Sequence, residues 1–327
     1  MNSNHATPYV NLTPDLILDA VESVGFVCNG SLLALNSYEN RVYQVGIEEG
    51  SPLIAKFYRP ERWTDACILE EHQFSDELVA QEIPVIAPLK NSEQKTLHDY
   101  QGYRFALFTR WGGRALELDN LEQLEWMGRF IGRMHAVSAT RDFQHRPTLN
   151  IQTHGINAYQ FVLEKNFIPD SLKKNYCSVV ETALQKIGEC FKRASPIKNI
   201  RVHGDIHPGN VLWDGQGPHI VDLDDCVMAP AMQDIWMLLS GDKHQQRSQL
   251  DTVLEGYQDF HDFNFRELHL IEALRTLRQL MYSGWLAKRW EDPAFPRHFP
   301  WFNTPHYWQE QIQNLQQQIY AMEEILK

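Results

Sequence analysis

The sequence predicts an α+β protein with two lobes: a small antiparallel β-sheet lobe with one main helix, followed by a mainly helical lobe. Its 327 residues suffice for two compact units of ordinary size. Short strand-like runs separated by turn residues fill the chain before about residue 110, and helical periodicities dominate after it. These observations place a boundary near Arg110 and divide the chain into residues 1–109 and 110–327.

The first lobe is expected to alternate short strands with two helices. Thr13 suits the cap of a helix that starts at Pro14, and Gly25 suits its end. Phe74 and Leu78 share one face of a later helix. The expected elements are, in order, the helix from Pro14, strands over 32–35, 41–47 and 53–58, a helix over about 65–81, a short strand between Pro84 and Pro88, and a strand over 103–109.

The second lobe is expected to be helical, with one strand-rich interruption. Helical periodicity covers 121–138 and 171–194, and it resumes at Asp234, ahead of an apolar helix over 235–239. The interruption lies between residues 200 and 223. The aromatic segment 295–308 is expected either to close a cleft or to pack on this lobe.

Charge and composition exclude several classes of function. A formal charge of -12 and the lack of a basic run argue against nucleic-acid binding. Five scattered cysteines without a CxxC pair favour reduced thiols over a disulfide framework. No apolar run approaches the about 20 residues of a membrane helix, so we expect a cytoplasmic protein without membrane contact. We also expect a monomer.

The strand-rich interruption carries the residues most suited to chemistry. It contains the spacing H-x-D-x-x-x-x-N, from His203 through Asp205 to Asn210, and an apolar strand that ends at Asp222. Phosphoryl transfer needs a carboxylate that orients the attacking hydroxyl and accepts its proton, a role that suits Asp205. It also needs oxygen ligands for Mg²⁺, and Asn210 and Asp222 are the candidates. Asp222 is therefore a candidate both for catalysis and for metal binding. The expected co-substrate is ATP.

A cation for the nucleotide phosphates is expected on the third strand. Lys56 closes the run Leu-Ile-Ala-Lys there, although a lysine on a strand usually faces solvent. The next helix offers a carboxylate to hold it. Glu71 is the preferred partner because it shares a face with Phe74 and Leu78, and Glu70 is nearly as suitable.

The turn at 36–40 occupies the place of a phosphate-binding loop, yet it has no glycine. Backbone N–H groups of a tight turn still bind phosphate, and Ser37 and Asn40 add polar side chains. We therefore expect this loop to contact ATP.

Other polar residues have competing interpretations. His203, His207 and His219 suggest a zinc site, but zinc needs three or four ligands in fixed geometry. Asp224 and Asp225 are either extra metal ligands or, as we favour, solvated turn residues. Asp234 is expected to cap the helix that follows it, and it is also placed to hydrogen-bond the segment around Asp205.

The motif H-G-D-x-x-x-x-N followed by V-D resembles the aminoglycoside phosphotransferase and choline kinase branch of the kinase-like superfamily. Protein kinases proper carry Arg at the position of Gly204. Four further stretches, 69–74, 132–137, 221–225 and 233–237, are similar to bacterial stress-response protein kinases of this same fold. The similarity spans nearly the whole chain.

The resemblance implies a bilobal protein-kinase-like fold and a serine/threonine protein kinase that acts in stress adaptation. It places the proton acceptor on Asp205, the magnesium ligands on Asn210 and Asp222, and the ATP-phosphate lysine on Lys56. Residues 1–109 become a nucleotide-binding lobe and 110–327 a catalytic and substrate lobe.

Two alternatives stay open at this level. A kinase for a sugar, amino alcohol or antibiotic needs the same catalytic residues as a protein kinase. A non-catalytic nucleotide-binding or scaffolding protein is less favoured, because Asp205, Asn210, Asp222 and Lys56 are all present.

Overall fold

A five-stranded antiparallel sheet organises the N-terminal part of the chain. The computed structural model describes residues 8–324, and the chain divides into two compact units. Within the described residues, unit 1 comprises 8–116, 143–146 and 208–225, and unit 2 comprises 117–142, 147–207 and 226–324. The fold class agrees with the expectation from the sequence, with a strand-rich first unit and a largely helical second one.

Unit 1 contains the strands of the large sheet and a smaller one. The large sheet has the order β1-β2-β3-β5-β4, and the small sheet has the order β6-β8-β9. The bounds are α1 (Pro14–Glu22), β1 (Cys28–Leu35), β2 (Arg41–Ile47), β3 (Leu53–Phe57), α2 (Asp65–Ala80), β4 (His98–Tyr100), β5 (Tyr103–Thr109), β6 (Arg114–Ala115), β8 (Val211–Asp214) and β9 (Gly217–Ile220).

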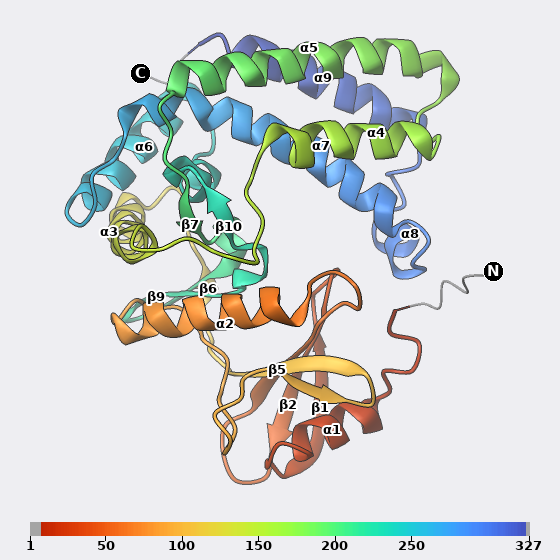
Figure 1. Ribbon diagram of the computed structural model, residues 1–327, viewed down its shortest axis with the longest axis vertical. Helices are drawn as coiled ribbons and strands as arrows, with labels where there is room; N and C mark the ends of the chain where they lie inside the picture. The colour runs from red at the N-terminus through yellow and green to blue at the C-terminus, as the bar shows by residue number, and fades with distance from the viewer. Residues whose placement is uncertain (1–7, 325–327) are drawn as a thin grey trace. The chain divides into compact units, whose positions relative to one another are not determined.

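The two faces of the large sheet are covered by different helices, and α1 and α2 lie on either side of its strands (Figure 1). Ala55 and Phe57 of β3 pack in one apolar cluster with Ile17 of α1. Because side chains alternate along a strand, Lys56 belongs to the opposite face, where its strand partner Ala106 packs with Ile68 of α2. The alternation therefore buries Lys56 under α2 and leaves it only 6% exposed, whereas a strand lysine usually faces solvent.

The hairpin β8–β9 is anchored to the segment that follows α2. Val85 forms a parallel bridge with Ile220, and the N–H of Ile220 donates to the carbonyl of Pro84. The expected strand between Pro84 and Pro88 is wrong, because only isolated bridges form there. Prolines at both ends limit the backbone donors that a longer ladder would need.

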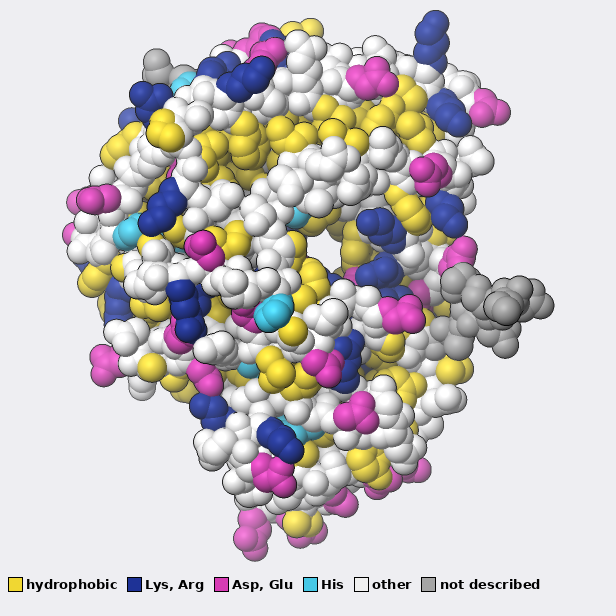
Figure 2. All heavy atoms as spheres, viewed as in Figure 1, with side chains coloured by type: hydrophobic (Ala, Val, Ile, Leu, Met, Phe, Trp, Pro, Cys, Tyr) yellow, Lys and Arg dark blue, Asp and Glu magenta, His cyan; other side chains and the backbone are white. Residues whose placement is uncertain are grey.

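Unit 2 is built from long helices and one small ladder, in which β7 pairs with β10. The bounds are α3 (Leu121–Ser138), a π-helical turn (Gln152–Ile156), α4 (Asn157–Glu164), α5 (Asp170–Ala194), β7 (Ile200–Val202), β10 (Val227–Ala229), α6 (Lys243–Gln258), α7 (Ile271–Arg289), α8 (Ala294–His298) and α9 (Pro305–Ala321). Figure 2 shows a band of hydrophobic side chains along the helices at the top of the view, beside α5. None of the helices within residues 8–324 is long and apolar enough to cross a membrane.

The expected apolar helix over 235–239 is wrong. The chain forms two short 3₁₀ turns there, Ala231–Asp234 and Trp236–Leu238. The physical reason is that the side chain of Asp234 accepts hydrogen bonds from another backbone segment and is not available as a cap.

The aromatic segment 295–308 packs within unit 2. Phe302 and Trp308 are fully buried, and Trp308 meets Tyr176 of α5 edge to face with ring centroids 5.3 Å apart. Trp301 differs from them because it stays 41% exposed. Most of the aromatic side chains of this segment therefore belong to the core.

Two glycines allow α3 to approach α6 closely. A Cβ at Gly128 would lie 2.1 Å from the carbonyl oxygen of Val253, and a Cβ at Gly132 would lie 2.4 Å from that of Tyr257. Backbone atoms cannot move away as a flexible side chain would, so both positions require glycine.

We predict that Gly132→Ala lowers the free energy of unfolding by about 1–3 kcal/mol, because the added methyl group overpacks the α3–α6 contact. The matched control is Gly188→Ala in α5, where no atom lies within 4 Å of the new Cβ. This control should be neutral or stabilising by about 0.5–1 kcal/mol, since alanine favours a helix. Urea unfolding of both variants measures the difference, and equal effects would contradict the packing argument.

Candidate active site

Lys56 is the centre of the polar cluster in unit 1. Its Nζ lies 2.8 Å from Oδ1 of Asp222, 3.5 Å from Oδ1 of Asp224 and 3.8 Å from Oε1 of Glu71. Burial by itself lowers the pKa of Lys56, but the surrounding carboxylates outweigh it and raise the pKa well above its ordinary value. The side chain is therefore a buried ammonium group, held between the sheet and the segment after β9.

The two glutamates of α2 have different surroundings. Glu71 is buried beside Lys56. Glu70 instead accepts backbone hydrogen bonds from residues 144–146, with N–O distances of 2.6, 2.9 and 2.8 Å. The carboxylate next to the lysine is thus that of Glu71, and Glu70 anchors the 143–146 segment to the rest of unit 1.

The pKa values of these glutamates move in opposite directions. Burial raises the pKa of Glu71 to about 7. Lys56 has the opposite effect on this pKa, but its Nζ lies nearer to Asp222 than to Glu71. Burial would also raise the pKa of Glu70, but its three backbone hydrogen bonds outweigh this and lower it.

Asn210 and Asp222 are brought side by side by the β8–β9 hairpin. Asn210 ends the short 3₁₀ turn Pro208–Asn210 before β8, and the N–H of Val221 donates to its carbonyl oxygen at 3.0 Å. Asp222 follows at a φ of 62°, a left-handed conformation that aspartate tolerates better than most residues. Its side chain is 52% exposed, so a carboxylate oxygen remains accessible.

The donor atoms of this pair fit a hard divalent cation. An amide oxygen and a carboxylate are the ligands that Mg²⁺ prefers, and magnesium usually completes its shell with water and phosphate. Among residues 8–324 no group of three or more His, Cys, Asp or Glu side chains is arranged to hold a metal ion. The pair therefore suits a metal that arrives with its own oxygen ligands better than a closed structural site.

Asp224 is not the solvated turn residue that the sequence suggested. It is 3% exposed, and its Oδ2 accepts from Arg62 and from Asn40, the latter at 3.1 Å. Arg146 also donates to its backbone carbonyl. Burial would raise the pKa of Asp224, but Arg62, Lys56 and Arg146 outweigh it and hold the pKa well below its ordinary range. Asp225, which also pairs with Arg62, is the exposed member of the two.

The glycine-free loop at 36–40 is tied to this network. Asn40 is buried; its side-chain oxygen accepts from the N–H of Arg59 at 3.1 Å, and its amide donates to Asp224. Ser37 Oγ donates to the carbonyl of Asn40 at 3.0 Å. Glu39 adds ion pairs with Arg59 at 3.6 Å and Arg62 at 3.9 Å.

Sequence reasoning missed Arg62 and the structural role of Asp224. Neither belongs to a spacing motif, and Arg62 lies in the irregular segment between β3 and α2. The sequence feature that could have indicated them is the group of three aspartates at 222–225. Buried carboxylates need positively charged partners, which here have to come from other segments.

In unit 2, Asp234 holds the segment that carries Asp205. Its Oδ2 accepts from the N–H of His203 at 2.9 Å, and its Oδ1 accepts from the N–H of Gly204 at 2.8 Å. Gly204 has a φ of 86°, which favours glycine over residues with a side chain. His135 of α3 lies 3.0 Å from the same Oδ2. The expected hydrogen bond from Asp234 to this segment is confirmed.

Asp205 itself has two basic neighbours. Nη2 of Arg278, on α7, lies 2.6 Å from its Oδ1, and Nε2 of His207 lies 3.7 Å from its Oδ2. Its backbone N–H donates to Nδ1 of His203 at 3.2 Å. Arg278 was not predicted, because it is 73 positions further along the chain, in an ordinary helical pattern.

The three histidines have separate surroundings. His203 is fully buried and accepts from the backbone of Asp205. His219 lies 2.9 Å from Asp214 and stacks on Trp111. These contacts give the rings of His203 and His219 local structural roles.

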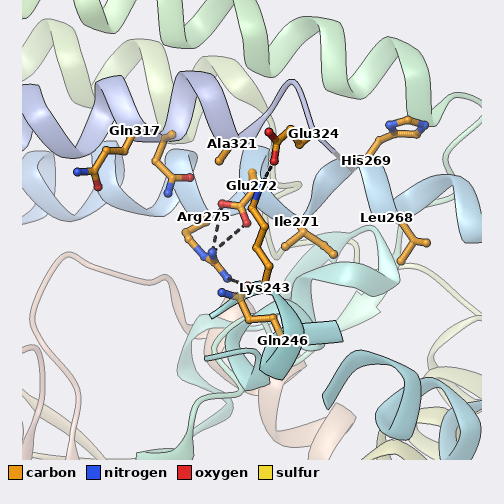
Figure 3. A pocket seen from close by; sticks show the side chains of 11 residues that line it. Lys243, Gln246, Leu268, His269, Ile271, Glu272, Arg275, Gln317, Ala321 and Glu324 are labelled. Carbon is orange, nitrogen blue, oxygen red and sulfur yellow. Dashed lines mark hydrogen bonds and ion pairs between the residues drawn. The ribbon is translucent and has the colours of Figure 1, made fainter. Parts of the chain in front are cut away.

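A separate pocket of about 290 Å³ lies in unit 2, among α6, α7 and α9. Its charged groups pair with one another: Arg275 with Glu272 at 2.9 Å, and Lys243 with Glu324 (Figure 3). None of the site residues predicted from the sequence lines it. Its lining is Lys243, Gln246, Leu268, His269, Ile271, Glu272, Arg275, Gln317, Gln318, Ala321 and Glu324.

The polar cluster of unit 1, the Asp205 segment of unit 2 and the fold of each unit define a protein of the kinase-like class, and comparisons with known proteins agree. Curated relatives include stress response kinase A of Shigella flexneri, 43% identical over 98% of this chain and 97% of the relative. Serine/threonine protein kinase RdoA of Salmonella typhimurium is 44% identical over 95% of this chain and 93% of the relative.

Solved structures show the same fold at low identity. Amicoumacin kinase hAmiN, in complex with AMP-PNP, Ca²⁺ and amicoumacin, has a TM-score of 0.72 at 18% identity and covers 94% of this chain and 93% of its own. A microcompartment-associated aminopropanol kinase has a TM-score of 0.72 at 16% identity, over 94% and 99% of the two chains.

The model of the family described as the phosphotransferase enzyme family matches residues 31–299. The chain belongs to this family, and it is a kinase.

We predict opposite pH trends for Glu71→Gln and Glu70→Gln. Between its ordinary pKa of 4.5 and about 7, Glu71 keeps a proton in the folded state that the unfolded chain has lost, so rising pH lowers the free energy of unfolding. The E71Q chain has no carboxyl group to titrate at this position, so its free energy of unfolding does not fall in this way. Relative to the wild type, its stability should therefore rise between pH 4.5 and about 7. Glu70 has a lowered pKa, so its stabilising effect is present above 4.5 and is lost as pH falls.

Urea unfolding of the three proteins from about pH 4 to about pH 8 measures these trends. The E70Q chain should lose most stability relative to the wild type at neutral pH and least in acid. Parallel curves for the two variants would contradict the assignment of their surroundings.

Proposed function

We propose that this chain is an ATP- and magnesium-dependent serine/threonine protein kinase of the bacterial stress response, acting in the cytoplasm. The observation that carries the proposal is the pairing of Lys56 with Asp222, beside Glu71, in a chain that also has the H-x-D-x-x-x-x-N spacing. The names of the relatives that span almost the full chain support a protein acceptor.

Each site residue has a chemical task in this proposal. Lys56 contacts the nucleotide phosphates, and Glu71 keeps it in place. Ser37 and the backbone of its loop line the phosphates, and Asn40 holds this loop in place through its hydrogen bonds with Arg59 and Asp224. Asn210 and Asp222 would hold the Mg²⁺ ion, which supplies positive charge to the phosphate oxygens. Residues 1–109 then act mainly as the nucleotide-binding lobe, and residues 110–327 as the catalytic and substrate lobe.

The transfer itself needs one proton acceptor. The hydroxyl oxygen of the acceptor forms a bond to the γ-phosphorus while the bond from that phosphorus to the β,γ-bridging oxygen breaks and ADP leaves. The hydroxyl proton passes to the carboxylate of Asp205. Asp205 orients the hydroxyl before the transfer, and the hydrogen bonds that the backbone N–H groups of its loop donate to Asp234 keep that backbone in place.

We predict that Asp205→Ala lowers kcat by about 10²–10⁴-fold, the usual contribution of a positioned base. Nucleotide affinity should change by less than about twofold, because Asp205 contacts the acceptor and not ATP.

Asp222→Asn should weaken nucleotide binding only when Mg²⁺ is present. Asp251→Asn, at an exposed carboxylate on α6, is the control. Steady-state kinetics measure kcat, and calorimetry with and without Mg²⁺ measures nucleotide affinity. An Asp205→Ala enzyme with the original kcat would contradict the assignment of Asp205 as the base.

A second experiment decides the acceptor class. Wild-type protein and the Asp205→Ala variant are incubated with labelled ATP and a bacterial lysate, and proteins are separated from small metabolites. We expect the wild type to label phosphoserine and phosphothreonine in proteins, and the variant to label neither. Label confined to small hydroxylated metabolites would replace the protein kinase by a small-molecule kinase of the same family.

A further inference from the structure

Arg278 is the nearest recorded charged partner of the proposed base. Its Nη2 lies 2.6 Å from Oδ1 of Asp205, and the two side chains are 35% and 15% exposed. A guanidinium and a carboxylate at this distance form an ion pair, and their attraction favours one orientation of the carboxylate. The other oxygen, Oδ2, lies 3.7 Å from Nε2 of His207.

Arg278 comes from a rigid part of unit 2. Its neighbours Leu277 and Leu280 on α7 are buried, and the Oγ of Ser283, one turn further on, bonds to the hydroxyl of Tyr307 at 2.7 Å. A side chain on such a helix holds its partner more firmly than one on a loop.

The charged residues of α7 itself are mostly basic. After Glu272, the charged residues of this helix are all basic: Arg275, Arg278, Lys288 and Arg289. Glu272 itself pairs with Arg275 (Figure 3). Tyr282, one turn after Arg278, is 37% exposed and stacks on Trp285 and on the exposed Trp301. An acceptor that reaches Asp205 along this helix therefore meets a cation and aromatic rings.

We propose that Arg278 is a positioning residue that also selects the acceptor: it holds Asp205 through Oδ1 and favours a serine or threonine flanked by acidic side chains. This inference rests on the proposed role of Asp205 as base, and it adds the charge of the substrate. A basic acceptor would place like charges beside the guanidinium, which lowers its affinity, while an acidic one gains from the same field.

The test compares two peptides that differ only in the residues beside a single serine, aspartates in one and arginines in the other. The wild type should show a kcat/KM about tenfold or more higher for the acidic peptide. Arg278→Gln should reduce this preference to less than about threefold and lower kcat for both peptides, with nucleotide affinity unchanged. Arg278→Lys keeps the charge and should retain the preference, although its kcat falls because a lysine lacks the planar guanidinium.

Arg275→Gln is the matched control, since Arg275 lies on the same helix but pairs with Glu272. It should keep both the preference and kcat. Loss of activity in Arg278→Gln without a change in preference would reduce Arg278 to a structural role and overturn the selection. A wild type that labels lysate proteins but prefers the basic peptide, or labels neither peptide, would also overturn it and leave the proposed function intact. A wild type that labels no protein at all contradicts the proposed function itself.

Discussion

The burial of Lys56 among carboxylates is the constraint on which the site in unit 1 depends. An ammonium group under a helix is tolerable only when opposite charges replace its lost water, and removing one partner of such a buried pair typically costs about 3–5 kcal/mol. Asp222 and Asp224 supply those charges, with Glu71 beside them, and two carboxylates carry more negative charge than one lysine offsets. Arg62 supplies the balance at Asp224.

This need for balance explains why distant segments meet at one place. Arg62 also pairs with Glu39, and Asn40 hydrogen-bonds to Asp224, so the loop at 36–40 is held by the same network as the lysine. A glycine-rich loop adapts to phosphate through its flexibility. This loop, which has no glycine, is instead positioned in advance by the buried side chain of Asn40 and the ion pairs of Glu39.

In unit 2, a second buried hydrogen-bond network holds the loop that carries Asp205. Asp234 accepts two backbone hydrogen bonds from the loop of Asp205, and His135 joins Asp234 to the hydroxyl of Tyr257, 3.0 Å away. His135 and Tyr257 lie on α3 and α6, whose approach requires Gly128 and Gly132. Helix packing, and not only the motif, therefore determines where Asp205 is held.

The sequence by itself determined the fold class, the bounds of several helices and strands, and the kinase motif, because these depend on local periodicity, turn residues and fixed spacing. The strand over 103–109 and the helix over 121–138 were predicted with the observed bounds. Only the tertiary structure decided that Glu71 and not Glu70 lies beside Lys56, that Asp224 is buried, and that Arg278 contacts Asp205. The physical reason is that burial and ion pairing arise between segments far apart in the chain, where no local pattern records which charges will meet.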